Sequence, residues 1–117
     1  MSINQVIISG HLGADVEVRD RSGGGRVATL RVCTDDGFSN DNNEWVSRPN
    51  WHNAVSFTPG QIDYLKRHAT SGRLVTVIGS LNYSTYRKEG EDTDRQSVSI
   101  FIDRVDFPTP ATRQKEG

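Results

Sequence analysis

The stretch NWHNAVSF, residues 50–57, carries two aromatic residues, Trp51 and Phe57, which are an even number of positions apart. Side chains of a β-strand alternate between its two faces, so residues an even number of positions apart share one face. The alternation predicts Trp51, Asn53, Val55 and Phe57 on one face, and His52, Ala54 and Ser56 on the other. Aromatic rings that share a face either pack into a core or form a surface on which planar ligands stack. The pattern alone leaves both interpretations open.

Enzyme chemistry would need a different set of residues. The closest carboxylate pairs are Asp15 with Glu17, on one face of a predicted strand, and Asp35 with Asp36. A metal-dependent nuclease could use such a pair. However, no histidine lies beside either pair, and the three histidines lack the spacing of a metal site: His11, His52 and His68. The sequence therefore predicts a protein that is not an enzyme and holds no metal or other cofactor.

The run RSGGGR, residues 21–26, contains three consecutive glycines. Glycine-rich runs of this kind occur both in phosphate-binding loops and in tight turns. A phosphate-binding loop would be followed by a helix and closed by Lys-Ser or Lys-Thr, and neither is found here. We therefore predict a hairpin turn.

Charge and composition restrict the possible partners. Lysine and arginine number 14 against 15 acidic residues, for a net charge of −1, so a site for nucleic acid must be a local patch. One cysteine, Cys33, excludes an intrachain disulfide and favours a reducing cytosol. The chain begins without a signal peptide and lacks the run of about 20 apolar residues of a membrane span. We expect a soluble intracellular protein that does not bind membranes.

The order of predicted elements indicates the fold class. Extended stretches are predicted at residues 4–12, 15–19, 27–34, 50–57, 74–81 and 97–107. Between Pro59 and Ser71 the spacing of Ile62 and Leu65 predicts a short helix. Glycines inside two strands, Gly10 and Gly79, are typical of bends or bulges in a barrel. Five main strands with one helix between the third and fourth predict an all-β, five-stranded OB-fold Greek-key barrel.

Two segments extend this barrel. Phe38 and Trp45 flank the turn-forming DNN of residues 41–43, so two large rings are predicted near a hairpin tip. They either fold back on the barrel, meet a partner subunit or stack on a ligand. Residues 1–107 are predicted as one domain. Residues 108–117 contain two prolines and little apolar content, which predicts a disordered C-terminal tail.

Five stretches together resemble the bacterial-type single-stranded DNA-binding proteins, the SSB family. They are NQVIISGHLGADVEVR at 4–19, VATLRVCTD at 27–35, EW followed by NWHNAVSF within 44–57, YLKRHATSGRLVTVIGSL at 64–81, and the closing strand. Their order and spacing match the family from Asn4 to about Phe107. The resemblance implies a protein that binds and protects single-stranded DNA with little sequence preference during replication, recombination or repair.

The resemblance also implies roles for particular residues. Positions at which the family stacks bases are Phe38, Trp45, Trp51, Phe57 and Tyr86. Arg19 matches a phosphate-contacting arginine, and His52 matches a histidine of the subunit interface. The small residues on the strand face of His52, Ala54 and Ser56, are expected to let a second barrel approach closely. Further candidates for phosphate contacts are Arg31, Arg48, Lys66, Arg73, Arg87 and Lys88, with Arg21 and Arg26 in the glycine turn. Phe38 and Tyr86 stand where the family usually has tryptophan, and both can stack.

Other expectations concern partners and an alternative function. By resemblance the protein is a homo-oligomer, most simply a tetramer, in the cytoplasm at the nucleoid. The chain ends QKEG, without the acidic tip through which the family recruits other replication proteins, so we expect little recruitment by this route. Several basic positions of the family are uncharged here: Gln5, Asn53, Thr58, Pro59, Asn82 and Ser84. The alternative is therefore an OB-fold oligomeric interaction module of the primosomal type, with weak or lost DNA binding.

Overall fold

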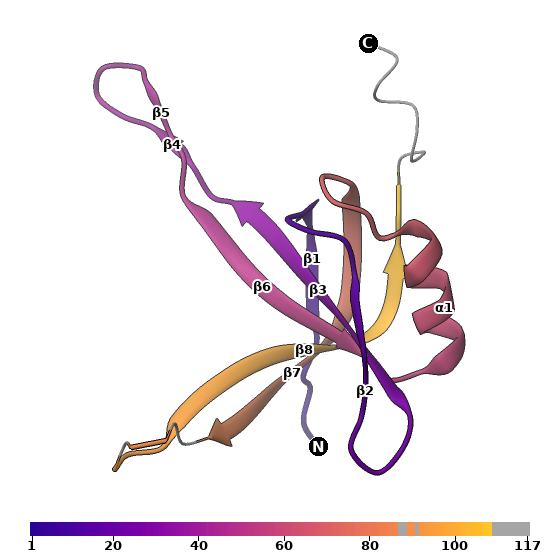
Figure 1. The fold of residues 1–117 in the computed structure, drawn as a ribbon. Helices are drawn as coiled ribbons and strands as arrows, with labels where there is room; N and C mark the ends of the chain where they lie inside the picture. The colour runs from indigo at the N-terminus through magenta and orange to yellow at the C-terminus, as the bar shows by residue number, and fades with distance from the viewer. Residues whose placement is uncertain (87–88, 91, 109–117) are drawn as a thin grey trace.

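Strands make up most of the structure, a computed structural model that describes residues 1–86, 89–90 and 92–108 (Figure 1). In chain order the elements are β1 (Val6–Leu12), β2 (Glu17–Asp20), β3 (Arg26–Asp35), β4 (Phe38–Ser39), β5 (Trp45–Val46), β6 (Pro49–Ser56), α1 (Pro59–His68), β7 (Leu74–Tyr86) and β8 (Arg95–Asp106). The predicted strands and helix are all found, with small shifts at their ends. The largest change is in β7, which continues five residues beyond the predicted end at residue 81.

Six strands form one sheet in the order β1-β7-β8-β6-β3-β2, and β1 also pairs with β3. This additional pairing, through His11 and Leu12, closes the sheet into a barrel. The strands pair antiparallel except β6 and β8, which are parallel at Ala54 and Val55. β1 and β2 lie in succession along β3 and together form the first of five main strands. The all-β OB-type barrel predicted from the sequence is confirmed.

Two interior glycines lie where neighbouring backbones of the barrel approach closely. A Cβ atom on Gly10 would collide with the carbonyl oxygen of Cys33, and one on Gly79 with that of Phe101. The pairing of β7 with β8 also shifts register between Ile78 and Gly79. Both glycines are therefore required by close packing, as the sequence suggested.

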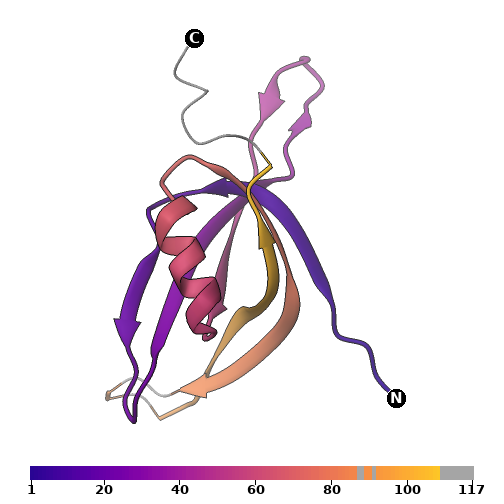
Figure 2. The ribbon, with the colours of Figure 1, turned by 90° about the vertical axis from the view of Figure 1, so that its right-hand side faces the viewer.

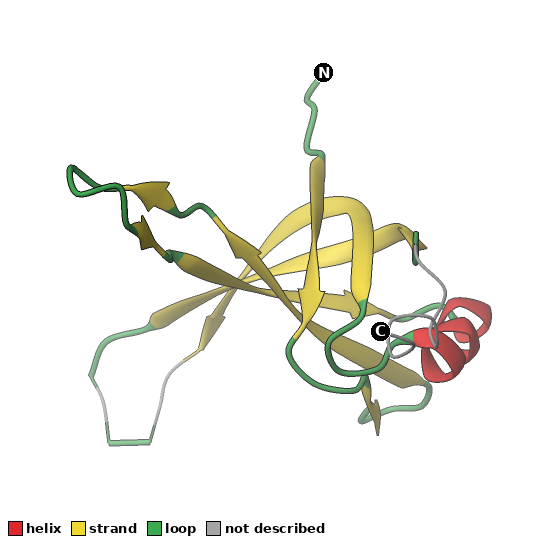
Figure 3. Ribbon diagram, turned by 90° about the horizontal axis from the view of Figure 1, so that it is seen from above, coloured by secondary structure: helices red, strands yellow, loops and turns green. Residues whose placement is uncertain are grey.

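The core lies between the inner faces of the strands and the helix α1. Its buried apolar residues include Leu30, Val32, Val75 and Val77 from strands, and Ile62 and Leu65 from α1. The helix starts with proline at its first turn and ends three residues before the predicted limit, where the backbone N–H of Ala69 bonds the carbonyl of Leu65. α1 lies at the end of the barrel away from the two long hairpins (Figures 1 and 3).

Two hairpins project from the barrel on the same side (Figures 1 and 3). One carries β4 and β5, and its DNN turn includes Asn43 at a positive φ of 63°. The other is formed by the far ends of β7 and β8, which remain paired up to Tyr86 and Arg95. At the start of the chain, the residues before β1 lead away from the barrel (Figure 2).

Two further expectations concern the C-terminal tail and membrane-spanning helices. The predicted disordered tail falls almost entirely on residues 109–117, which are outside the described residues. Within the described part of the chain, no helix has the length and apolarity that crossing a membrane requires.

Candidate nucleic-acid interface

The outer surface of β2, β3, β6 and β8 carries a row of exposed aromatic and basic side chains. The predicted alternation in β6 is confirmed: Ala54 and Ser56 are buried, whereas Trp51 and Phe57 are exposed. Strand register brings the same-facing residues of neighbouring strands together, because Trp51 pairs with Cys33, Asn53 with Arg31 and Val55 with Thr29. On the other side of β6, Val55 pairs with Phe101. We call this surface, defined by Trp51, Arg31, Val55, Phe57 and Phe101, the aromatic face.

Trp51 is held in place by a glycine and an arginine. Its side chain is 50% exposed, and its ring lies so close to Gly13 that a Cβ atom there would be 2.5 Å from a ring carbon. The guanidinium carbon of Arg31 lies 5.2 Å from the ring centroid, in the range of a cation–π contact. Arg31 also donates to the Asn53 amide oxygen at 3.4 Å. The ring is therefore exposed to solvent but restricted in orientation.

Phe57 forms the opposite end of the aromatic face. Its ring packs against Phe101 in a T-shaped arrangement, with centroids 5.2 Å apart and planes at 69°. The guanidinium carbon of Arg21, from the glycine turn between β2 and β3, lies 4.6 Å from the Phe57 centroid. The turn itself is confirmed: its three glycines have positive φ, and Arg21 N–H donates to the Gly25 carbonyl. Phe57, like Trp51, thus pairs an exposed ring with an arginine.

The β4–β5 hairpin repeats this arrangement beyond the barrel. Arg48 lies over Phe38, with 5.9 Å between the guanidinium carbon and the ring centroid. Trp45 is 65% exposed, and its ring lies over Gly37, where a Cβ atom would be 2.5 Å from a ring carbon. Neither aromatic residue folds back into the core. Both tryptophans therefore lie against a glycine, a feature that the sequence analysis did not identify.

A carboxylate fixes the base of this hairpin. Asp35 Oδ1 accepts from the backbone N–H groups of Arg48 and Gly37, each at 2.9 Å, and Oδ2 accepts from Ser47 Oγ at 2.8 Å. These hydrogen bonds, that of Arg48 first and then that of Ser47, lower the pKa of the Asp35 carboxyl below its ordinary value. The ionised carboxylate thus joins the two arms of the hairpin.

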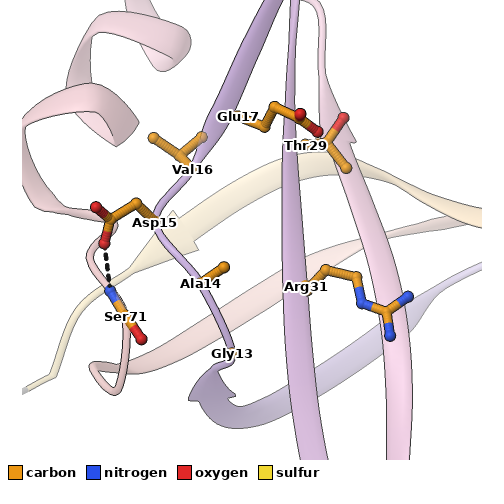
Figure 4. A pocket seen from close by; sticks show the side chains of 8 residues that line it. All are labelled: Gly13, Ala14, Asp15, Val16, Glu17, Thr29, Arg31 and Ser71. Carbon is orange, nitrogen blue, oxygen red and sulfur yellow. Dashed lines mark hydrogen bonds between the residues drawn. The ribbon is translucent and has the colours of Figure 1, made fainter.

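A groove of about 620 Å³ is lined in part by Gly13, the glycine against which the Trp51 ring lies (Figure 4). It is lined by the β1–β2 connection, by Thr29 and Arg31 on β3, and by Ser71. One of the two carboxylate pairs that a metal-dependent nuclease could use, Asp15 with Glu17, lies here and has structural partners. Asp15 Oδ1 accepts from the Ser71 backbone N–H at 2.8 Å, and Glu17 forms a 2.7 Å ion pair with Arg19. In the described part of the chain, no three acidic, histidine or cysteine side chains form a possible metal site.

Arg73 has to be removed from the predicted DNA-contacting residues. It is only 7% exposed, and its guanidinium donates to the carbonyl of His68, the last residue of α1, at 2.8 Å. Its guanidinium carbon also lies 4.6 Å from the Phe107 ring centroid. A guanidinium at the C-terminal end of a helix compensates the partial negative charge there. This side chain therefore has an internal structural role.

The remaining predicted basic and hairpin residues are less closely connected with the aromatic face. Lys66 is exposed on α1, at the end of the barrel away from the hairpins (Figure 1). Arg26 forms a 3.3 Å ion pair with Asp63 of α1. Tyr86 is the last residue of β7, and its proposed stacking stays a prediction. Arg87 and Lys88 are outside the described residues.

The geometric reason for placing His52 at a subunit interface is wrong. We expected small residues on its strand face, Ala54 and Ser56, to let a second barrel approach. Both are at most 1% exposed in the core of their own barrel, so this face points inward. His52 is half-buried, and its Nε2 lies 2.9 Å from the Thr34 hydroxyl. Its role in an interface stays a prediction based on the resemblance.

An OB-type barrel with exposed rings and arginines on one face defines a class of proteins that bind oligonucleotides or oligosaccharides. Comparison with protein families agrees with this class: the model of the single-strand binding protein family (SSB) matches residues 3–108. The chain belongs to this family. The sequence resemblance is confirmed.

Curated relatives include single-stranded DNA-binding proteins from animals and bacteria. The mitochondrial protein of Drosophila melanogaster is 33% identical over 91% of this chain and 71% of its own length. The protein of Rhizobium meliloti is 28% identical over 86% of this chain and 58% of its own length. The chain thus spans between about half and three quarters of the length of such relatives.

Solved structures of similar fold include two single-stranded DNA-binding proteins. The Plasmodium falciparum SSB in complex with ssDNA has a TM-score of 0.76 and 26% identity, covering 91% of this chain and 93% of the other. A deletion mutant of the Thermus aquaticus protein has a TM-score of 0.70 and 24% identity over 89% of this chain and 49% of the other. At 24% identity, the match to the Thermus aquaticus protein supports the fold alone.

Proposed function

We propose that this protein binds single-stranded DNA with little sequence preference. The observation that carries the proposal is the repeated pairing of an exposed ring with a guanidinium group: Trp51 with Arg31, Phe57 with Arg21, and Phe38 with Arg48. Every base has a π-face, so an aromatic ring binds any base, and a nearby cation binds the phosphate that follows it. No base-edge contact is needed, which accounts for the absence of sequence preference in the proposal.

The proposed interface runs over the aromatic face and onto the two hairpins. Stacking is assigned to Trp51, Phe57, Phe38, Trp45 and Tyr86, and phosphate contacts to Arg19, Arg21, Arg31 and Arg48. Arg19 reaches this role by exchanging its exposed ion pair with Glu17 for a phosphate, at little cost since exposed ion pairs contribute only ~0–1 kcal/mol. Lys66 is left out because it lies on α1, and Arg26 is left out because it forms an ion pair with Asp63 of α1. Family membership and the ssDNA complex of the Plasmodium falciparum protein support this assignment.

Intrinsic tryptophan fluorescence during titration with oligo(dT) tests the proposal, in the presence and absence of a divalent metal. We expect quenching without cleavage, and Trp51→Ala should weaken binding about tenfold or more, since each stacked base contributes ~1–3 kcal/mol. Cleavage with metal would indicate a nuclease. No response at all would favour the alternative of an interaction module that has lost DNA binding. The circular dichroism of the variant must remain that of the unmodified protein.

We further propose that the protein acts as a homo-oligomer, most simply a tetramer, in DNA replication, recombination or repair at the nucleoid in the cytoplasm. Among the residues that the structure describes, β1 pairs with β7 along its length but with β3 only at His11 and Leu12, which leaves an edge along residues 6–10. Such an edge can pair with a second chain. The exposed Ile3 and Ile7 next to it support an apolar contact. The mitochondrial relative indicates that this family also operates in another compartment.

A further inference from the structure

Phe101 is an exposed ring on β8 that neither the sequence analysis nor the family resemblance identified. Its neighbours in sequence, Ile100 and Ile102, point inward and are 3% and 9% exposed, so they supply the contribution of β8 to the core. Phe101 points to the opposite side and remains 38% exposed. A large apolar ring at this position is not required for the core of the barrel.

Its position places Phe101 between two parts of the proposed interface. On one side it pairs with Val55 of β6 and packs against Phe57. On the other side it pairs with Ser80 of β7. The N-terminal part of β8, before Phe101, extends away from the barrel into the hairpin that ends at the pairing of Tyr86 with Arg95; Figure 1 shows this extension of β8. Phe101 therefore continues the aromatic face towards this hairpin.

The hairpin surface beyond Phe101 carries short polar side chains. Alternation along β7 and β8 places five short polar residues on the same side as Phe101: Ser80, Asn82, Ser84, Ser97 and Ser99. The larger side chains of Tyr83 and Val98 pair with each other on the opposite side. Serine hydroxyls and amide groups are frequent donors to phosphate and sugar oxygens. From Phe101 to the Ser84–Ser97 pair, this side of the hairpin therefore offers a polynucleotide only short polar side chains.

We propose that Phe101 is an additional base-stacking residue, which carries the bound strand from Phe57 across β8 to the β7–β8 hairpin. The inference rests on the proposed function, since it assigns a further contact to the same interface. Phe57 and Phe101 form a corner of two rings at 69°, so each supports the other and neither needs to reorder when a base binds. Arg21, over Phe57, supplies the cation next to this corner.

Two variants test the role of Phe101. Phe101→Leu retains apolar bulk but removes the ring, and we expect it to weaken oligo(dT) binding roughly fivefold or more, as for the loss of one stacked base. The matched control is Val98→Ala, which alters an exposed apolar residue of the same strand on the opposite side and should leave the affinity unchanged. Circular dichroism and thermal unfolding of both variants check the fold.

A direct contact is tested by Phe101→Trp combined with Trp45→Phe and Trp51→Phe, which leaves position 101 as the only tryptophan. Oligo(dT) should quench its fluorescence. Unchanged affinity of Phe101→Leu, or no quenching at position 101 while the protein still binds, overturns the inference and leaves the proposed function standing. If the unmodified protein shows no binding to oligo(dT), both fail together.

Discussion

Each exposed tryptophan of this protein lies against a glycine, and this arrangement affects binding as well as local packing. The rings of Trp51 and Trp45 occupy the space that a Cβ atom on Gly13 or Gly37 would need. A ring confined in this way loses less conformational freedom when a base stacks on it, so more of the stacking free energy is retained as affinity. The absence of a side chain thus shapes the proposed site.

Gly13→Ala tests this effect directly. The new methyl group would be 2.5 Å from the Trp51 ring, so the ring must move, and only its outer atoms are in the way. We expect oligo(dT) binding to weaken roughly two- to tenfold, less than for complete removal of one stacked base. The tryptophan emission of the free protein should also change.

The matched control for Gly13→Ala is Gly60→Ala. Gly60 lies in the first turn of α1, and a Cβ atom there meets nothing within 4 Å. Affinity equal to that of the unmodified protein is expected for this variant. If Gly13→Ala also binds normally, the orientation of Trp51 does not limit binding.

Single residues were predictable from the sequence where strand alternation determines their direction. Trp51 and Phe57 are predictable in this way because the stretch that carries them follows a single alternating pattern. Phe101 follows the same alternation but stands between Ile100 and Ile102, so the segment resembles a continuous apolar core strand. Arg73 was misassigned because its burial depends on the end of α1 and on Phe107, which are tertiary contacts.

At the scale of elements, the β4–β5 hairpin depends on one ionised side chain. Asp35 accepts hydrogen bonds from Arg48, Ser47 and Gly37, so its carboxylate connects the strand entering the hairpin with the strand leaving it. The sequence predicted the turn itself from DNN, and Asn43 has the required positive φ. The connection is not predictable from the sequence, because Ser47 and Arg48 lie 12 and 13 residues from Asp35 and meet it only when the hairpin has formed.

The hairpin should therefore loosen in acid. The pKa of Asp35 is lower in the folded protein than in the unfolded chain, so its contribution to stability is fully present above the ordinary value of about 4. The contribution is lost as pH falls through the lower folded value. In a Trp51→Phe background, the fluorescence of Trp45 should stay constant from neutral pH to about 5 and change below about 4.

Asp35→Asn provides the control for this acid transition. An amide accepts hydrogen bonds without titrating, so the change in Trp45 fluorescence below about pH 4 should shift or disappear. An identical transition in the variant would assign it to other carboxyl groups. Hydrogen exchange at the backbone N–H of Arg48 gives an independent measurement of the same contact.

At the scale of the whole molecule, the barrel is closed but β1 leaves part of one edge without a partner strand within the described chain. Edge strands of this kind are usually protected by charge, by proline or by pairing with another chain. Here the exposed side chains next to the edge include Ile3 and Ile7. Pairing with a second copy would cover both the edge and this apolar surface.

Light scattering at micromolar concentration and neutral pH measures the oligomeric state. We expect the mass of an oligomer, most simply four times 13.0 kDa. Ile7→Lys should reduce the mass, because a charge at the contact must be desolvated when it is covered. Thr58→Lys, at an exposed residue before α1 and outside β1 and β7, separates the effect of β1 from that of a general increase in charge. A monomer in the unmodified protein would contradict the proposal.

The final prediction concerns how binding responds to salt. The chain has a net charge of −1, so its affinity for a polyanion depends on local arginines rather than on a general field. The described part of the proposed interface offers Arg19, Arg21, Arg31 and Arg48, of which Arg19 is already paired with Glu17. Each neutralised phosphate contributes ~0.7 to the slope of log affinity against log salt, so four contacts give about 3.

A shallow slope of about 2–3 is therefore expected with an oligo(dT) of about 8 nucleotides, within the site size of one OB barrel. Arg31→Ala should reduce the slope by about 0.7, because it removes one phosphate contact. Lys66→Ala should leave it unchanged, since Lys66 lies on α1 and outside the proposed interface. A slope above about 5 would require more phosphate contacts than these arginines provide. A reduction in Lys66→Ala equal to that in Arg31→Ala would instead extend the path of the bound strand around the barrel to the helix.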